Sequence, residues 1–172
     1  NVTNSDIFKI KYPNDIYALD NEIYKKISGI LIEHNFLGSI CTNSIIGIGI
    51  NVLEDSFPEE LKSTSTSLKI LNLIDSKNSI LKKDNALQIL QDAIAEYFNY
   101  YYDLYSQDKN SDIFNEWSDE LNIIGKDVLI LDNNQRANIV EILEDSRLRA
   151  ILYDNKNEII IDNGNSIRYK FD

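Results

Sequence analysis

Two glycines placed two residues apart in an apolar segment are the first feature that could serve chemistry. Gly47 and Gly49 lie within residues 44–52, SIIGIGINV, which read as a strand that is apolar on both sides and therefore central and buried. Residues two apart in a strand point to the same face, so this face lacks side chains at two adjacent positions. A ligand could approach the backbone closely there, and so could a helix or another strand. The pattern alone gives these two interpretations equal weight.

Polar and charged side chains occupy two segments upstream of the glycine pair. Residues 11–15 read KYPND, and residues 26–33 read KISGILIE. Asn14 and Asp15 follow the proline, where their short side chains favour an Asx turn and are equally suited to polar contacts at a site. The second segment places a lysine and a glycine inside an apolar run. The sequence thus offers a cation, a carboxylate and an amide near strands with little side-chain bulk.

Strands must position these residues. Alternating apolar and charged residues, separated by turn residues, predict strands at residues 7–12, 16–19, 27–34 and 44–52. Turns are expected at residues 20–22 and at Gly38-Ser39. The lysine-bearing and glycine-bearing segments are therefore expected to belong to one sheet.

Helices are expected after these strands. The polar residues 53–67 read as a surface loop, and residues 68–74 read as a short helix. A long helix follows the N-cap residue Asp84, because apolar side chains then recur at spacings of three and four. A shorter helix is expected near Phe114 to Leu121.

A second module is expected after Gly125, where short β-rich segments alternate with polar turns. Five strands are predicted, at residues 127–131, 137–143, 147–153, 158–161 and 166–171. Five short strands in so few residues are typical of a small SH3-like β-barrel. The predicted fold class is α+β, with one domain over residues 1–121 and a second over residues 122–172.

Composition excludes several classes of function. The 172 residues include 17 Lys and Arg against 28 Asp and Glu, a formal net charge of −11, which argues against a nucleic-acid binder and against docking on anionic lipid. Cys41 and His34 are single, which excludes a disulfide scaffold, a cysteine zinc site and a His-rich metal site within the chain. No apolar run approaches the ~20 residues that span a bilayer, so a cytoplasmic protein is expected.

Taken together, the three segments resemble the catalytic domain of biotin–protein ligases. That family reads Lys-Trp-Pro-Asn-Asp, then Lys-apolar-small-Gly-Ile-Leu-apolar-Glu, then Gly-x-Gly-Ile-Asn-Val. This chain has the same motifs in the same order, with Tyr12 in place of the tryptophan. Residues 65–68, STSL, are similar to the family's Ala-Thr-Ser-Leu, and the glycines at 125 and 164 fit its C-terminal module. The resemblance implies a class II synthetase-like mixed sheet with helices, followed by the SH3-like barrel.

The resemblance implies a two-step ligase reaction. Such enzymes join biotin to ATP as biotinyl-5′-AMP and then pass the biotinyl group to a lysine of a carboxylase's biotin carboxyl carrier domain. A carboxylate and a phosphate must meet, so fixed cations are needed to offset their repulsion. Lys26 matches the family lysine that touches both anions; otherwise it is an exposed strand lysine. Its neighbour Lys25 should point to the opposite face and take no part.

The remaining site residues follow from the same resemblance. Asp15 matches the carboxylate near the adenylate, where it could orient the incoming amine or accept its proton. Asn51 matches the residue near the ATP phosphates and Mg²⁺. Lys11 and Asn14 match motif positions whose roles are as much structural as ligand-binding. The glycines that would let biotin and the adenylate lie against the sheet are Gly29, Gly47 and Gly49.

Two departures from the family pattern bear on activity. The Gly-Arg-Gly-Arg-x-Gly loop and the upstream residues that hold biotin are absent, and the chain contains no methionine. These 172 residues are therefore expected to be the C-terminal part of a longer enzyme and to catalyse poorly alone. A homodimer is compatible with the resemblance. Two alternatives remain, a lipoate ligase-like acyltransferase and a ligase-derived binding module without catalysis.

Overall fold

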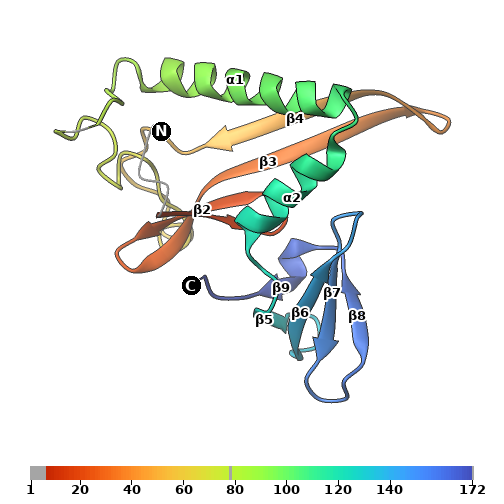
Figure 1. The fold of residues 1–172 in the computed structure, drawn as a ribbon. Helices are drawn as coiled ribbons and strands as arrows, with labels where there is room; N and C mark the ends of the chain where they lie inside the picture. The colour runs from red at the N-terminus through yellow and green to blue at the C-terminus, as the bar shows by residue number, and fades with distance from the viewer. Residues whose placement is uncertain (1–6, 78, 172) are drawn as a thin grey trace. The chain divides into compact units, whose positions relative to one another are not determined.

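A computed structural model describes residues 7–77 and 79–171, which form two compact units (Figure 1). Within the described chain, the first unit holds residues 7–10 and 14–98, and the second holds residues 11–13 and 99–171. The division falls inside a helix, and the predicted domain boundary after residue 121 stays a prediction. Two helices and two sheets confirm a fold that mixes α and β elements.

The first sheet has the strand order β1-β2-β3-β4. Its strands are β1 (Phe8–Lys11), β2 (Asp15–Asp20), β3 (Ile23–Leu37) and β4 (Ile40–Ile50). The β2–β3 and β3–β4 pairs are antiparallel. Asn21 and Glu22 both have positive φ, at 49° and 68°, which is the backbone of a two-residue hairpin turn. The predicted turns at residues 20–22 and at Gly38-Ser39 are both confirmed.

A hydrophobic core lies between this sheet and the segments that follow it. Helix α1 (Ala86–Ser106) starts with the buried Ala86 and packs Ile89 and Leu90 against the core. The fully or nearly buried members of the core come from strands, connecting segments and this helix: Ala18, Ile27, Val52, Leu68, Ile74, Leu81 and Ala86. Apolar periodicity therefore predicted the helix correctly, two residues after the expected N-cap.

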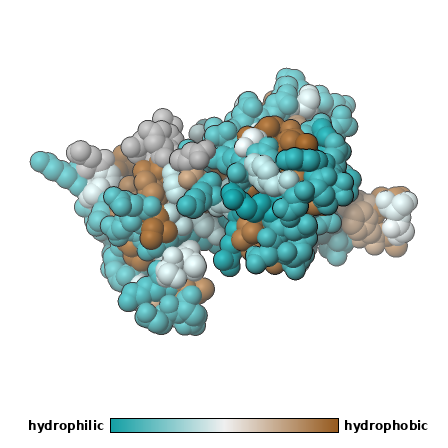
Figure 2. All heavy atoms as spheres, turned by 90° about the horizontal axis from the view of Figure 1, so that it is seen from below, coloured by the Kyte–Doolittle hydropathy of each residue, from teal (hydrophilic) through white to brown (hydrophobic). Residues whose placement is uncertain are grey.

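The predicted central, buried position of residues 44–52 is wrong for residues 44–49, although Val52 does belong to the core. Strand β4 is an edge strand of the described sheet, and its side chains are exposed from Ile40 to Gly49. Figure 2 shows apolar colour along the projecting end of the β3–β4 hairpin, at the right of the view. The error has a physical cause, because an apolar sequence shows that a strand suits burial but not which element would cover it.

The predicted short helix at residues 68–74 is also wrong. Leu68 and Lys69 donate their amides to the carbonyls of Asn51 and Val52, so these backbone groups bond to a strand end instead of a helical turn. Asn72 has a positive φ of 56°, which a continuing helix does not allow. The sheets are antiparallel where pairs are resolved, and the parallel element in the described chain is a single bridge between Lys26 and Ser65. The class II synthetase-like mixed sheet stays a prediction.

The second unit contains helix α2 (Asn110–Leu121) and an antiparallel sheet in the order β8-β7-β6-β5-β9. Its strands match the five predicted ones: β5 (Asp127–Ile130), β6 (Arg136–Ile142), β7 (Leu148–Leu152), β8 (Glu158–Ile161) and β9 (Ile167–Arg168). Buried residues alternate along β6 and β7, so one face of the sheet forms the core. The short strands are confirmed, and the assignment to an SH3-like barrel stays a prediction.

Within the described residues, no helix combines the length and the apolar character that crossing a membrane requires.

Candidate functional site

An ion pair between Lys26 and Asp15 is the centre of the candidate site. Lys26 Nζ lies 2.7 Å from Asp15 Oδ1, and the two side chains are 44% and 21% exposed. The pairing register shifts between Ile16 and Tyr17, so β3 carries one extra residue in a β-bulge. Residues three apart in a regular strand point to opposite faces, and the bulge brings Lys26 to the face of Gly29.

Gly29 lies directly beneath this ion pair. A methyl group at Gly29 would lie 2.8 Å from Asp15 Oδ1 and 3.1 Å from Lys26 Nζ. In the sheet, Gly29 pairs with both Asp15 and Gly49, and Leu31 pairs with Gly47. Methyl groups at Gly47 and Gly49 would meet only backbone oxygens, at 3.8 and 4.0 Å. The sheet surface beside the ion pair is therefore free of side chains over Gly49.

The backbone of Lys26 is held on its other edge by the segment that follows β4. Lys26 donates its amide to Thr64 O at 2.8 Å, and Lys26 O accepts from the Thr66 amide at 2.9 Å. These two bonds form the parallel bridge between Lys26 and Ser65. Residues 64–66 were expected to be surface loop, so sequence reasoning missed that they hold the lysine in place. The similarity of residues 65–68 to the family motif was the available signal.

Asn51 is tied to the same segment. Its side-chain Nδ2 donates to Thr66 O at 3.0 Å, and its amide donates to Ile27 O at 2.9 Å. Asn51 is therefore linked to Lys26 through Thr66, which bonds to both residues. The side-chain Nδ2 of Asn51 is already engaged, whereas its Oδ1 has no hydrogen bond among the described residues. The structure thus brings together Lys26, Asp15, Gly29, Gly49 and Asn51 in one unit.

Asn14 supports the sheet around the ion pair, and Tyr17 lies near Asp15. Asn14 O accepts from the Ile30 amide at 3.1 Å, and Asn14 Nδ2 donates to Ile30 O. These bonds fit the structural interpretation of Asn14. Burial raises the pKa of the Tyr17 hydroxyl, and the nearby Asp15 carboxylate adds to the rise, so Tyr17 stays neutral at physiological pH.

Lys11 and Tyr12 belong to the second unit and bond to its C-terminal part. Its Nζ lies 3.5 Å from Gly164 O, and the neighbouring Tyr12 amide donates to the Tyr169 hydroxyl at 2.8 Å. Tyr12 is buried, and burial is the main cause that raises its pKa. These contacts favour a structural role for Lys11.

We expect Gly29→Ala to separate the Lys26–Asp15 pair. The added methyl group would lie well inside contact distance of both side chains, and these flexible ends can move away more easily than the strand backbone can. Crystal structures of the variants would measure the Nζ–Oδ1 distance. The matched control is Gly49→Ala, whose methyl group meets only ordinary contacts and should leave the distance at 2.7 Å. An intact pair in Gly29→Ala would contradict the packing described above.

We expect Thr66→Val to stabilise the fold. Thr66 is fully buried, and its Oγ1 has no hydrogen-bond partner among the described residues. Removing an unsatisfied buried hydroxyl should add about 1 kcal/mol to the free energy of unfolding and raise Tm by about 4–8 °C. Thermal denaturation measures both. The control is Ser67→Ala, equally buried but bonded to Glu54 O and to the Ile70 amide, which should lower Tm. A lower Tm for Thr66→Val would show that the hydroxyl has a partner.

Comparison with known proteins was made by sequence and by structure. No family model matches the chain. The chain is 48% identical over 61 residues to the bifunctional ligase/repressor BirA of Bacillus spizizenii, a match that spans 34% of this chain and 18% of that protein. The apo biotin protein ligase of Aquifex aeolicus has a similar fold, with a TM-score of 0.59, 22% identity and coverage of 95% of this chain and 65% of its own.

The same Aquifex ligase has also been solved in complex with biotin and ATP. That structure gives a TM-score of 0.60 at 22% identity, and the match covers 95% of this chain and 62% of that one. The chain thus spans less than two thirds of the length of these relatives. The resemblance to biotin protein ligases that the motifs predicted is confirmed, in sequence over 61 residues and in fold over 95% of the chain.

Proposed function

We propose that this chain carries the lysine-bearing part of the active site of a biotin protein ligase. The supporting observation is the Lys26–Asp15 ion pair, which lies over Gly29, where there is no side chain. The neighbouring sheet surface at Gly49 is also free of side chains. The similarity in fold to a ligase solved with biotin and ATP supports the same function. The reaction would be ATP-dependent formation of biotinyl-5′-AMP, followed by transfer of biotin to a carrier lysine.

Lys26 would supply positive charge where two anions meet. Its ammonium has three N–H donors, and Asp15 takes one of them. The side chain is exposed enough for a biotin carboxylate and an ATP phosphate to reach the others. The backbone bonds to Thr64 and Thr66 hold the strand that carries this cation, and the ion pair with Asp15 orients the ammonium group. The positive charge would therefore be in place where the negative charge develops.

Asp15 would serve the second step. The acceptor lysine arrives as an ammonium group and must lose a proton before it attacks the mixed anhydride. A carboxylate at the edge of the adenylate can orient that ammonium and accept its proton. The direct ion pair with Lys26 would keep the Asp15 carboxylate aimed at the same place. The pair would therefore hold the cation for the first step and the base for the second.

Asn51 and the glycines would line the adenylate. Gly47 and Gly49 present open backbone, and Asn51 Oδ1 is available as an acceptor. The described residues contain no group of three His, Cys, Asp or Glu side chains that could hold a metal ion. Mg²⁺ would enter bound to the ATP phosphates.

The finer assignments belong to the same proposal. They are a class II synthetase-like domain to residue 121, an SH3-like domain from residue 122, and Lys11 and Asn14 as residues that shape the site. The implied partners are biotin and a biotin carboxyl carrier domain, in the cytoplasm, with no membrane or nucleic-acid partner for this chain. A homodimer is compatible with the proposal.

A transfer assay tests the function. The polypeptide as its gene encodes it, and separately the 172-residue chain, would be incubated with biotin, ATP, Mg²⁺ and a carrier domain and then blotted with streptavidin. We expect labelling by the gene-encoded polypeptide and far less by the 172 residues alone. Equal labelling would contradict the expected loss of activity. Transfer of lipoate in preference to biotin would overturn the substrate, and biotin binding without transfer would overturn the enzyme class.

A further inference from the structure

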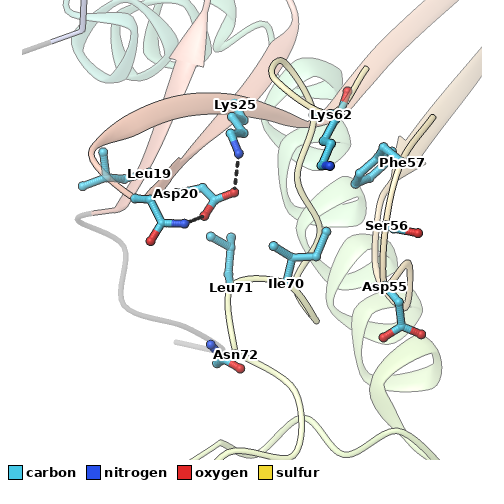
Figure 3. Close-up of a pocket in the computed structure, with 12 residues that line it drawn as sticks. Leu19, Asp20, Lys25, Asp55, Ser56, Phe57, Lys62, Ile70, Leu71 and Asn72 are labelled. Atoms are coloured by element: carbon cyan, nitrogen blue, oxygen red, sulfur yellow. Dashed lines mark hydrogen bonds and ion pairs between the residues drawn. The ribbon is translucent and has the colours of Figure 1, made fainter. Parts of the chain in front are cut away.

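A pocket separate from the candidate site lies between the β2–β3 hairpin and the segment that follows β4 (Figure 3). Its volume is about 490 Å³, within the usual range for small-molecule sites. Lys25, the neighbour that was expected to take no part, lines it. None of Lys26, Asp15, Gly29, Gly47, Gly49 and Asn51 does.

A buried ion pair forms the polar end of this pocket. Lys25 Nζ lies 2.8 Å from Asp20 Oδ2, with side-chain exposures of 17% and 7%, and Asn21 Nδ2 donates to Asp20 Oδ1 at 2.9 Å. Burying a carboxylate costs several kcal/mol unless it is fully paired, and here each oxygen has one donor. The pair therefore fixes Lys25 at the pocket wall, with two of its three N–H donors unused by Asp20.

The two carboxylates that line the pocket are more tightly paired than the second lining lysine. The acid at its other side, Asp55, is paired with Lys69 at 2.6 Å, so both lining carboxylates are already neutralised. The second lining lysine, Lys62, has only a 3.7 Å contact with Glu59 and is largely exposed. An anionic head group would meet the loosely paired Lys62 ammonium and the N–H donors that Lys25 keeps beyond its bond to Asp20, whereas a cationic head would meet acids that are already paired.

Four apolar side chains also line the pocket, Leu19, Phe57, Ile70 and Leu71, and Figure 3 shows them together with Lys25 and Lys62. Ser56, Ser65 and Asn72 complete the lining. We propose that the pocket binds a small monocarboxylate with an apolar body, its carboxylate on Lys25 and Lys62 and its body against Phe57, Ile70 and Leu71. This proposal does not depend on the proposed ligase function, because it rests on other residues.

Binding of 4-phenylbutyrate to the 172-residue chain tests the proposal. Nuclear magnetic resonance titration would measure the Kd and map the perturbed residues, with 4-phenylbutan-1-ol and 4-phenylbutylamine as probes of matched size. We expect a Kd on the order of 1 mM for the acid, which suits a ligand of this size. The alcohol and the amine should bind about tenfold more weakly, because they lack the charge-assisted bonds. The perturbed residues should be those that line the pocket.

Two lysine variants assign the head group. Lys25→Met should weaken the acid about tenfold, and it also leaves Asp20 without its partner. Lys62→Met, at an exposed position, should weaken it about threefold without affecting the fold. The control is Lys83→Met, an exposed lysine outside the pocket, which should bind like the unaltered chain. Equal binding of the alcohol, perturbations centred elsewhere, or no binding of the acid at 10-fold the expected Kd would each overturn the proposal.

Discussion

Replacing Lys26 with methionine is expected to lower biotin transfer by the gene-encoded polypeptide about 10²–10³-fold. Methionine keeps the apolar stem and removes the ammonium group that offsets the charge of the two reacting anions. Losing one fixed donor to a developing anion typically has this cost in kcat. Since the charge matters most in the transition state, kcat and kcat/KM should fall by similar factors. Initial rates at varied biotin and ATP concentrations measure both.

The matched control for this variant is Lys83→Met. It removes the same charge from an exposed position in the same unit, so its rate should stay within a factor of about two. The Lys26 variant should remain folded, because the backbone bonds to Thr64 and Thr66 do not involve the side chain. A folded Lys26→Met protein with an unchanged rate would show that Lys26 takes no part in the reaction. The proposed function would then rest on the similarity in fold alone.

The strands around Lys26 could be predicted from sequence because their signals are local. Alternating side chains and turn residues such as Asn21 act within a few positions. The β-bulge that turns Lys26 toward Gly29 could not be predicted, because it depends on which residues pair across β2 and β3. A regular strand would have put these two residues on opposite faces. The motif spacing matched the family, but the physical reason for that spacing is visible only in the paired strands.

The structure of the segment after β4 could not be predicted from local sequence patterns either. Its polar Ser and Thr residues are typical of a loop, yet Thr66 and Ser67 are fully buried. Ser67 uses its hydroxyl as a turn residue would, accepting from the Ile70 amide. The bonds from residues 64–66 to Lys26 are long-range, and no local pattern encodes them. By contrast, the strands of the second unit were predicted well, because each ends in a polar turn that composition alone marks.

Replacing Gly164 with alanine is expected to destabilise the second unit by about 3 kcal/mol, a fall in Tm of about 10–20 °C. A methyl group there would lie 2.2 Å from Tyr12 O and 2.5 Å from Pro13 Cδ. Neither atom is the end of a flexible side chain, so the backbone of residues 11–13 must move. That movement would strain the bonds from the Tyr12 amide to Tyr169 and from Lys11 to Gly164. Thermal and urea denaturation measure the loss.

Gly125→Ala is the graded control for this prediction. Gly125 has a positive φ of 84°, and no atom lies within 4 Å of the position that a methyl group would take. Its alanine variant therefore meets only the cost of the left-handed backbone, about 1–2 kcal/mol, without a clash. If Gly164→Ala were no more destabilising than Gly125→Ala, the close approach of Tyr12 and Pro13 would be wrong. A larger loss of stability in Gly164→Ala would show that Gly164 is needed for Tyr12 to pack closely against it. The KYPND motif and the glycine of the C-terminal module would then match the family for one structural reason.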